Sequence, residues 1–256
     1  MMARWLEFVR QVAQSPGMVT GVRKVAFDQK FELTWEELTS SKLTYEDLGY
    51  TRTKGRQLER IYWPVPEVEA AFAKLASRKG KPHSSVAIQL KNGIKDSRSQ
   101  GRCLQNMVVT QTDKLLYVDI FYRSTEVIQK FLADLVFFSQ KLPTYFPGRK
   151  PNAVRMHFAN TYLSAVFVPI LLRYDPDPME FFTTLKEQDP KFFRTFGLAA
   201  RRNFNPTCVY NYRTRVKQWE YHQEHVGNVS SKMRPVIRLL STLKGEIIEE
   251  PEPDEL

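Results

Sequence analysis

The chain has 256 residues, of which 42% are hydrophobic and 12% aromatic, so it is long enough for one large globular domain or two small ones. No apolar run approaches the ~18 residues that cross a bilayer. Glu7 and Arg10 interrupt the apolar segment that a secretory signal would need. Two cysteines exclude a disulfide framework, so we expect a cytoplasmic protein with no membrane association.

The charge is unevenly distributed. The net charge is +10, and the last eleven residues hold six acidic and no basic side chains, which leaves +16 on residues 1–245. Such a basic body suits an anionic partner, either a nucleotide or a nucleic acid, although a basic surface that only keeps the protein in solution explains the same numbers. Pro251 and Pro253 among the acids indicate disorder. We therefore predict a single domain over 1–245 and an acidic, disordered tail over 246–256.

The hydrophobic pattern predicts an α+β protein with strands in the middle of the chain. The expected elements, in chain order, are a helix over 5–12, a strand over 25–33, a loop or short helix over 39–50, a helix over 66–75, a β-rich run over 85–90, a polar loop over 92–102, paired strands over 104–110 and 115–121, a helix over 126–140 and an apolar element over 157–172. Ser124 is placed to cap the helix that we expect to begin at Glu126.

Two residues in the middle of the chain suggest chemistry. Cys103 follows Arg102 at the edge of a predicted strand, and a neighbouring cation favours the thiolate that attacks carbon. Arg123 and Ser124 end the next strand, where a guanidinium group, a hydroxyl and free backbone N–H groups suit a phosphate. Taken singly, such a cysteine is more often an inert small hydrophobe, and such an arginine a solvated surface residue.

The spacing of these residues points to a family. Arg123 lies twenty residues after Cys103, and the hairpin between them carries Lys114-Leu115. This pattern resembles the central motif of thymidylate synthases, and the similarity is best over 85–160. It implies a central mixed β-sheet flanked by helices and a homodimer formed through the sheet. It also implies that Cys103 is a nucleophile, that Arg123 and Ser124 hold the phosphate of a pyrimidine nucleoside monophosphate, and that 5,10-methylenetetrahydrofolate is the one-carbon donor.

The resemblance also assigns a residue that selects the base. Asp134 lies 31 residues after Cys103, where the family has asparagine for uracil and aspartate for cytosine. A carboxyl group can accept from the 4-amino group of cytosine and, when protonated, donate to N3. We therefore predict a deoxycytidylate (dCMP) hydroxymethylase-like transferase in which Asp134 reads cytosine. An alternative interpretation is a surface carboxylate that pairs with Lys130, four residues earlier.

Weaker similarities add further substrate-binding candidates. His157 and Asn160 partly match the family's sugar-binding motif, and Arg23 is a substitute for an arginine of its early phosphate loop. A second cationic group sits where the family places arginines that reach the partner subunit: Arg78, Lys79 and Lys81.

Two alternative functions stay open. Only Glu36 and Glu37 stand near the position of the family's catalytic glutamate helix, which favours a binding or assembly protein that kept the fold without catalysis. Basic residues alternate with aromatic ones over 201–219, which favours a relative that modifies bases in nucleic acid, although a buried aromatic stripe gives the same pattern. His222 and His225 lack the further ligands of a metal site, so no metal is predicted.

Overall fold

A computed structural model gives the fold of this chain. It describes residues 1–20, 23–48, 50, 53–77, 83–90, 103–112, 114–164, 167, 171, 174–175 and 177–194. Arg78, Lys79 and Lys81, predicted at the phosphate site, lie outside the described residues, as do the segment 201–219 and the acidic tail.

The described residues form helices and a six-stranded sheet. The strands are β1 (Gly17–Thr20), β2 (Arg23–Thr34), β3 (His83–Gln89), β4 (Leu104–Thr112), β5 (Leu116–Glu126) and β6 (Ala153–Ser164). The helices are α1 (Met2–Gln14), α2 (Trp35–Thr39), α3 (Lys54–Tyr62), α4 (Val65–Ser77), α5 (Lys130–Lys141) and α7 (Pro178–Gln188), with short 3₁₀ turns η1 (Glu46–Leu48) and η2 (Leu142–Tyr145).

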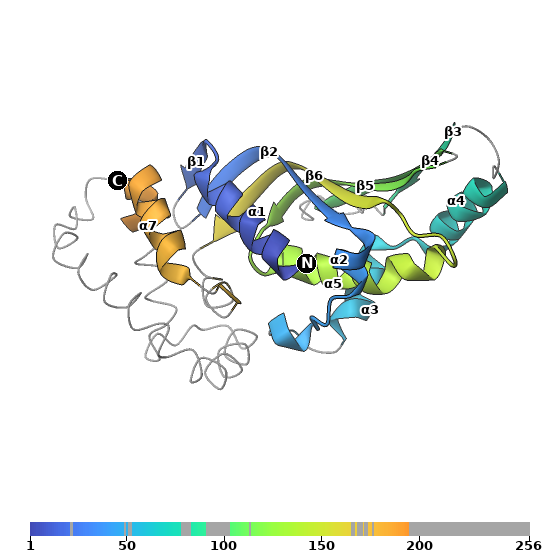
Figure 1. Ribbon diagram of the computed structural model, residues 1–256, viewed down its shortest axis with the longest axis horizontal. Helices are drawn as coiled ribbons and strands as arrows, with labels where there is room; N and C mark the ends of the chain where they lie inside the picture. Colours follow the sequence, from blue (N-terminus) through green and yellow to red (C-terminus); the bar gives the residue numbers. More distant parts are fainter. Residues whose placement is uncertain are drawn as a thin grey trace, which may run out of the picture.

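The strand order is β1-β2-β6-β5-β4-β3, and every neighbouring pair is antiparallel except β5 and β6. A parallel pair needs a long crossover connection, and α5 supplies it. In Figure 1, α3, α4 and α5 lie below the sheet, and no described helix covers its upper face. The prediction of an α+β protein with a mixed sheet flanked by helices is confirmed. The thymidylate synthase fold and the dimer stay predictions.

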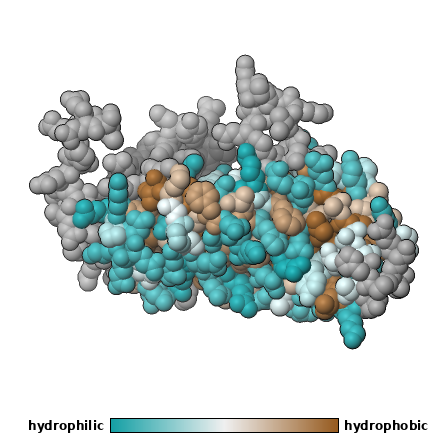
Figure 2. All heavy atoms as spheres, turned by 90° about the horizontal axis from the view of Figure 1, so that it is seen from above, coloured by the Kyte–Doolittle hydropathy of each residue, from teal (hydrophilic) through white to brown (hydrophobic). Residues whose placement is uncertain are grey.

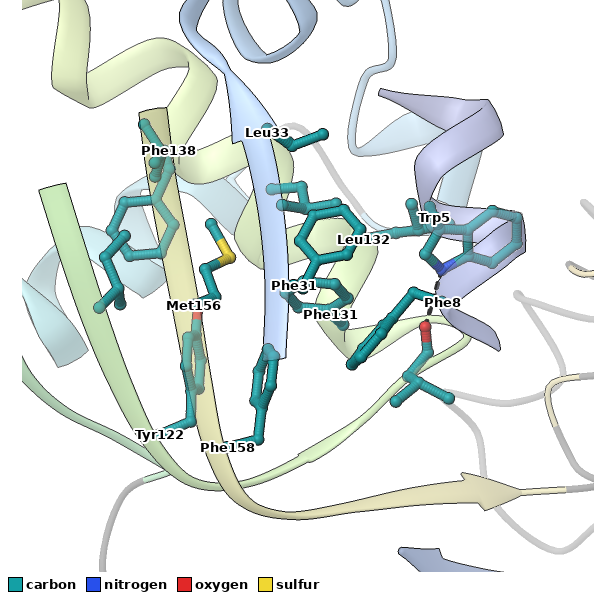
Figure 3. Close-up of a cluster of buried hydrophobic side chains, with 14 of the residues drawn as sticks. Trp5, Phe8, Phe31, Leu33, Tyr122, Phe131, Leu132, Phe138, Met156 and Phe158 are labelled. Carbon is teal, nitrogen blue, oxygen red and sulfur yellow. Dashed lines mark hydrogen bonds between the residues drawn. The ribbon is translucent and has the colours of Figure 1, made fainter. Parts of the chain in front are cut away.

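Aromatic side chains fill the space between the sheet and α1 and α5. Phe8 of α1, Phe31 of β2, Phe131 of α5 and Phe158 of β6 form one cluster, with neighbouring ring centroids 5.0–5.5 Å apart (Figure 3). All four are buried because alternate strand residues and one helix face point to the same side. This cluster fixes the position of α5, the helix that carries Asp134.

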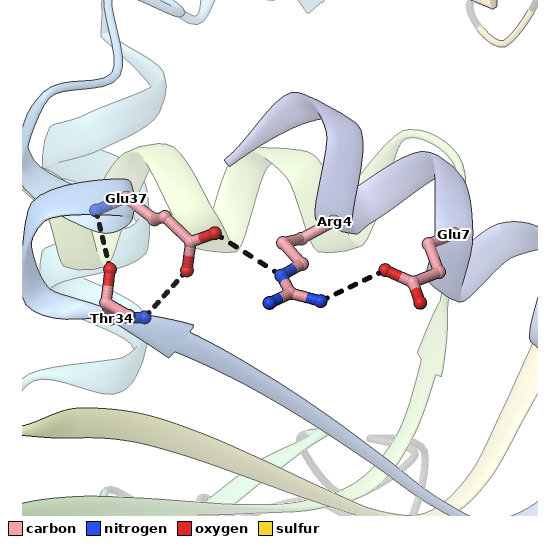
Figure 4. Close-up of polar contacts among 4 residues, drawn as sticks. All are labelled: Arg4, Glu7, Thr34 and Glu37. Carbon is pink, nitrogen blue, oxygen red and sulfur yellow. Dashed lines mark hydrogen bonds and ion pairs between the residues drawn. The ribbon is translucent and has the colours of Figure 1, made fainter.

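Polar contacts join the first two helices. Thr34 and Glu37 form a capping box at the start of α2, in which the Thr34 hydroxyl accepts from the Glu37 N–H and the Glu37 carboxylate accepts from the Thr34 N–H. Arg4 of α1 donates to the same carboxylate at 3.3 Å and pairs with Glu7 (Figure 4). Glu37, one of the two candidates for the family's catalytic glutamate, is therefore engaged in holding α1 and α2 together.

The hydrogen-bonded ladder is interrupted at one level in four neighbouring strands. The register of β2 and β6 skips Asp28 and Ala159, and the register of β5 and β6 skips Arg123 and Ala159. The register of β4 shifts between Leu104 and Asn106. Asp28 has a positive φ of 51°, which aspartate tolerates better than most residues. In Figure 3, β6 turns sharply just beyond Phe158, so this aligned interruption bends the sheet.

The start of α5 differs from the prediction. We expected a helix over 126–140 capped by Ser124, but β5 continues through Glu126 and α5 begins at Lys130. Ser124 stays in the strand, opposite Asn160 of β6. The apolar element expected over 157–172 is β6, which already begins at Ala153. A helix over 54–62 was not predicted, and it supplies a residue of the site described below.

Candidate functional site

At the bend of the sheet the side chains of Cys103 and Ser124 lie together, and the backbone of Arg123 is hydrogen-bonded to that of Cys103. The backbone N–H of Arg123 donates to the Cys103 carbonyl at 2.7 Å, which fixes the residue just before β4 beside the end of β5. The Cys103 Sγ atom then lies 3.7 Å from the Ser124 Oγ atom. Cys103 is half-buried and is a free thiol. A partly accessible thiol beside a hydroxyl is an arrangement that suits a nucleophile.

Asn160 and Arg23 lie on the same side of this arrangement along the sheet. Asn160 is the register partner of Ser124 on β6. Two residues further on, Tyr162 has the Arg23 guanidinium 5.2 Å from its ring centroid, and the Lys130 ammonium 3.5 Å from its hydroxyl. Two cations therefore lie beside Tyr162, two residues along β6 from the register partner of Ser124, and such groups suit an anionic, hydroxyl-bearing ligand.

Asp134 is buried in the first half of α5, with 6% of its surface exposed. It is therefore not the solvent-exposed carboxylate that pairs with Lys130, and that interpretation was wrong. Burial raises the pKa of Asp134 to about 7. The charge of Lys54, the Tyr122 hydroxyl and the charge of Lys130 lower the same pKa, but by less than burial raises it. A large part of the Asp134 population is protonated near neutral pH, which an exposed aspartate would not be.

The charge of this carboxyl group acts on three phenols and a lysine. Tyr122 of β5 and Tyr45, just before η1, are buried, and neither hydroxyl has a hydrogen-bond partner of good geometry among the described residues. Burial raises the pKa of both phenols, and the charge of Asp134 raises it further. The pKa of Tyr50 is raised by burial, then by the charge of Glu126 and then by that of Asp134. Lys54, at the start of α3, has its Nζ atom 4.5 Å from the Tyr50 ring centroid.

Tyr122 links this polar cluster to the cysteine. Its pKa is raised by burial first, then by the charge of Asp134, with smaller contributions from Tyr62 and from Cys103. Tyr122 lies directly before Arg123 and opposite Leu104 in the ladder. The carboxyl of Asp134 and the thiol of Cys103 thus both act on one buried phenol. We call Cys103, Tyr122, Ser124 and Asp134 the central cluster.

A second buried carboxylate shapes the approach to α5. The Glu126 side chain, fully buried, accepts hydrogen bonds from the backbone N–H groups of residues 128, 129 and 130 at 3.0, 2.7 and 3.2 Å. Burial raises its pKa to about 7 although these three N–H groups and Lys130 lower it. Glu126 therefore does the capping that we expected of Ser124, and it leaves the Ser124 hydroxyl available to face Cys103.

The structure does not bring His157 to the central cluster. Its Nε2 atom lies 2.9 Å from Asp119, and its ring stacks on Phe121 with centroids 4.7 Å apart. Phe121 alternates with the core-facing Tyr122, so both rings lie on the sheet face that no described helix covers. That face, seen in Figure 2, mixes hydrophilic and apolar residues, and Phe121 is 37% exposed.

Several residues of the site were missed in the sequence. The sequence does point to Tyr122 as an inward-facing residue, because Tyr122 continues the alternation of Val118 and Ile120. No sequence pattern points to Lys54 or Tyr50, since both stand in a polar stretch that only folding brings against α5. The Leu58, Ile61, Tyr62 spacing was the available sign of α3.

A groove lies beside Tyr45, between α3 and α5. It has a volume of about 440 Å³, and its wall includes Tyr45, Arg56, Phe137 and Lys141. Lys141 pairs with Glu59 across it.

Among the described residues, no group of three or more His, Cys, Asp and Glu side chains is arranged to hold a metal ion. In the same part of the chain, no helix combines the length and apolar character needed to cross a membrane.

Comparison with known proteins adds no family assignment. The sequence matches no protein-family model, and no curated protein matches it.

Proposed function

We propose that this protein transfers a one-carbon unit to C5 of a pyrimidine deoxynucleotide, with dCMP as substrate and hydroxymethyl-dCMP as product. The observation that carries the proposal is the central cluster, in which a partly accessible thiol, a hydroxyl and a buried carboxyl group of raised pKa meet around Tyr122. A thiol alone, or a buried carboxyl alone, would not favour this chemistry over others.

The Cys103 thiolate adds to C6 of the pyrimidine, and a bond forms between Sγ and C6. The electron pair of the C5–C6 double bond moves toward N3, which takes a proton, and C5 becomes a nucleophile like that of an enamine. C5 then forms a bond to the one-carbon unit, whose bond to the donor's nitrogen breaks, and C5 loses its own proton to solvent; water supplies the hydroxyl group of the product. N3 returns its proton to Asp134 as the thiolate is expelled, which restores the C5–C6 double bond and frees Cys103.

Asp134 selects cytosine in this proposal. When protonated, it donates to N3, and its carbonyl oxygen accepts from the 4-amino group. The raised pKa of Asp134 supports this role, because the protonated form is populated near neutral pH. Uracil presents an N3–H donor and a 4-oxo acceptor, so it pairs only with a carboxyl whose proton lies on the other oxygen. The preference for cytosine therefore requires the proton on the oxygen that faces N3.

The phosphate and sugar lie toward the bend of the sheet. Arg123 and Ser124 hold the phosphate in the proposal, with Arg23 as a further cation, and Asn160 contacts the sugar. The position of Asn160 opposite Ser124 and that of Arg23 beside Tyr162 support these roles. His157 lacks such support. In a homodimer formed through the uncovered sheet face, Arg78 and Lys79 of the second subunit would complete the phosphate site.

The proposed donor is 5,10-methylenetetrahydrofolate, which when bound supplies a carbon at the oxidation level of formaldehyde. The groove beside Tyr45 fits such a group, since its volume lies in the range of small-molecule sites and Tyr45 and Phe137 offer aromatic walls. Arg56 in the same groove would hold a carboxylate of the donor.

One observation favours a second candidate function, a nucleotide-binding protein without catalysis. Glu37 is used in the capping box and by Arg4, and Glu36 lies 3.7 Å from Lys150. Neither glutamate is thus placed to relay protons at the central cluster. A binding protein would keep the affinity for dCMP and show no chemistry at C5.

The test is tritium release from [5-³H]dCMP, together with calorimetry of dCMP and dUMP binding. We expect Cys103→Ser to abolish release and to leave dCMP binding largely intact. The matched control is Cys208→Ser, at the second of the two cysteines in the sequence, which should change neither. Asp134→Asn should shift the preference from dCMP toward dUMP. Tritium release by Cys103→Ser at the wild-type rate would overturn the mechanism, and dCMP binding without release in the wild type would favour the second candidate.

A further inference from the structure

A surface beyond the bend of the sheet combines apolar side chains with an aromatic ring. Met18 of β1 and Phe27 of β2 are 56% and 49% exposed, the two largest exposed fractions among the large hydrophobic side chains of the described residues. Tyr162 of β6 is half-buried. Exposed apolar side chains that gather in one place, rather than singly, indicate a surface that a partner covers.

The ladder of the sheet shows that these side chains are neighbours. Met18 pairs with Val25 of β2, and Val25 pairs with Tyr162 of β6. Phe27 stands two residues along β2 from Val25 and pairs with Asn160. Residues that pair directly point to the same face, and diagonal neighbours such as Phe27 and Tyr162 lie about 7–8 Å apart. Met18, Phe27 and Tyr162 therefore share one continuous surface.

Two cations border this surface. Arg23, exposed on β2, has its guanidinium carbon 5.2 Å from the centroid of the Tyr162 ring. The ammonium of Lys130, exposed at the start of α5, lies 3.5 Å from the Tyr162 hydroxyl. Among the described residues that pair in these rows, the acid is Glu126, which is fully buried and accepts from backbone N–H groups. We call Met18, Arg23, Phe27, Lys130 and Tyr162 the aromatic–basic patch.

The charge of the patch selects its partner. Asp28, exposed beside Phe27, offsets only part of the charge of Arg23 and Lys130, so the patch stays net positive. A second copy of this chain in an isologous contact would set two positive patches against each other. A polyanion with flat apolar faces matches both features of the patch, because phosphates pair with the cations and bases stack on the rings. The charge of +16 on residues 1–245 attracts the same polyanion from a distance.

We propose that the aromatic–basic patch binds single-stranded nucleic acid, with two successive bases on Phe27 and Tyr162 and the adjoining phosphates on Arg23 and Lys130. The rings bind a single strand because its bases can leave their own stack, whereas those of a duplex are held inside the helix. Binding requires no base-specific hydrogen bond, so strands of different sequence should bind alike.

The position of the patch relates it to the proposed substrate site. The row of Phe27 and Asn160 continues to Ser124, whose hydroxyl lies 3.7 Å from the Cys103 Sγ atom. A strand on the patch therefore runs next to the thiol. Arg23, which also serves the phosphate of dCMP in the proposed function, contacts a strand phosphate in the same way. Binding of a strand needs no chemistry at Cys103, and so it extends beyond the proposed function.

The first experiment measures the anisotropy of a fluorescein-labelled twelve-residue oligothymidylate as protein is added. Stacking contributes enough per base that Phe27→Ala and Tyr162→Ala should each raise Kd about five- to hundredfold. Phe27→Tyr keeps an aromatic ring and should keep the affinity. The matched control is Leu115→Ala, which removes a side chain that is 40% exposed in the turn between β4 and β5, and it should bind as the wild type does.

The second experiment repeats the titration at increasing KCl concentration. Each phosphate contact contributes about 0.7 to the slope of log Kd against log salt for a single strand. Arg23→Met and Lys130→Met should therefore each lower this slope by about 0.7. Lys114→Met removes an exposed cation from the turn that holds Leu115, and it should leave the slope unchanged.

Urea unfolding checks that each variant is folded. Wild-type affinity and slope in all the patch variants would overturn the strand site, and so would equal affinity for a duplex of the same length. Binding of the wild type to phosphatidylserine vesicles without binding of the oligonucleotide would identify a lipid-binding surface instead and would also overturn it. Oligonucleotide binding by a protein that releases no tritium from [5-³H]dCMP upholds the strand site and overturns the proposed function. Tritium release without oligonucleotide binding does the reverse.

Discussion

Replacement of Asp134 with asparagine removes a carboxyl group that is nearly inaccessible to water, and the stability of the protein should report this directly. Asparagine has almost the same shape, so the aromatic packing around α5 stays intact. The pKa of Asp134 is raised from 3.8 to about 7 in the folded chain. The folded state therefore binds this proton more tightly than the unfolded state, and the cost of ionising the group in the folded state lowers stability as pH rises.

The size of the effect follows from that shift. Three pH units correspond to about 4 kcal/mol at 1.36 kcal/mol per unit. Below pH 3.8 both states hold the proton and the cost is absent; it grows between pH 3.8 and about 7 and is complete above pH 7. Asp134→Asn avoids this cost, so the variant should gain on the wild type by up to about 4 kcal/mol between pH 4 and pH 8.

Urea unfolding followed by tryptophan fluorescence measures the difference, because Trp5, Trp35 and Trp63 are all buried. Glu126 is present in both proteins, so its own titration cancels in the comparison. Asp28→Asn is the matched control, since Asp28 is exposed and asparagine tolerates its positive φ. A constant stability difference between wild type and Asp134→Asn across this pH range would refute the reasoning, and so would a variant less stable than wild type at pH 8.

Three further outcomes are expected. Glu126→Gln should speed hydrogen exchange of the backbone N–H groups of residues 128–130, because the amide offers them one acceptor oxygen where the carboxylate offers two; unchanged exchange would contradict the cap. Gly17→Ala should destabilise the β1–β2 pair by about 1–3 kcal/mol, since its Cβ would lie 2.0 Å from the Val25 carbonyl oxygen, and hydrogen exchange of β1 amides that is no faster would refute this. Sedimentation should show a dimer for the wild type and a monomer for Phe121→Glu, and a wild-type monomer at micromolar concentration would end the dimer prediction.

The fold was predictable where the hydrophobic period was regular. Alternating apolar residues predicted the first residue of β4 and came within one residue of the start of β5, but the predicted strands ended two and five residues too early. The helical spacing of Phe131, Leu132, Leu135 and Val136 predicted α5. The start of α5 was predicted too early because Val127 and Ile128 continue the helical spacing, although residues 127–129 form the turn that Glu126 caps. A side chain that caps from inside a preceding strand leaves no clear mark in the sequence.

The site was predictable only in part. The distance from Cys103 to Arg123 follows from a hairpin, and hairpin lengths are visible in a sequence. The contribution of Lys54 and Tyr50 depends on how the segment between α2 and α4 packs against α5, which no local pattern specifies. His157 was predicted to bind substrate from a motif match, which takes no account of the alternation of side chains along β6. This alternation points the His157 ring to the uncovered face.

The aligned interruption of four strands sets a rule for how this chain can change its length. A deletion of one residue on one side of the bend would shift that strand alone, turn its remaining side chains to the opposite face and break the alignment with its neighbours. The hairpin between Cys103 and Arg123 crosses this level on both of its arms. We therefore expect relatives of this chain to vary in length between β3 and β4 or after β6. We expect them to keep the separation of twenty residues between the positions of Cys103 and Arg123, even where nearly every residue in between has been exchanged.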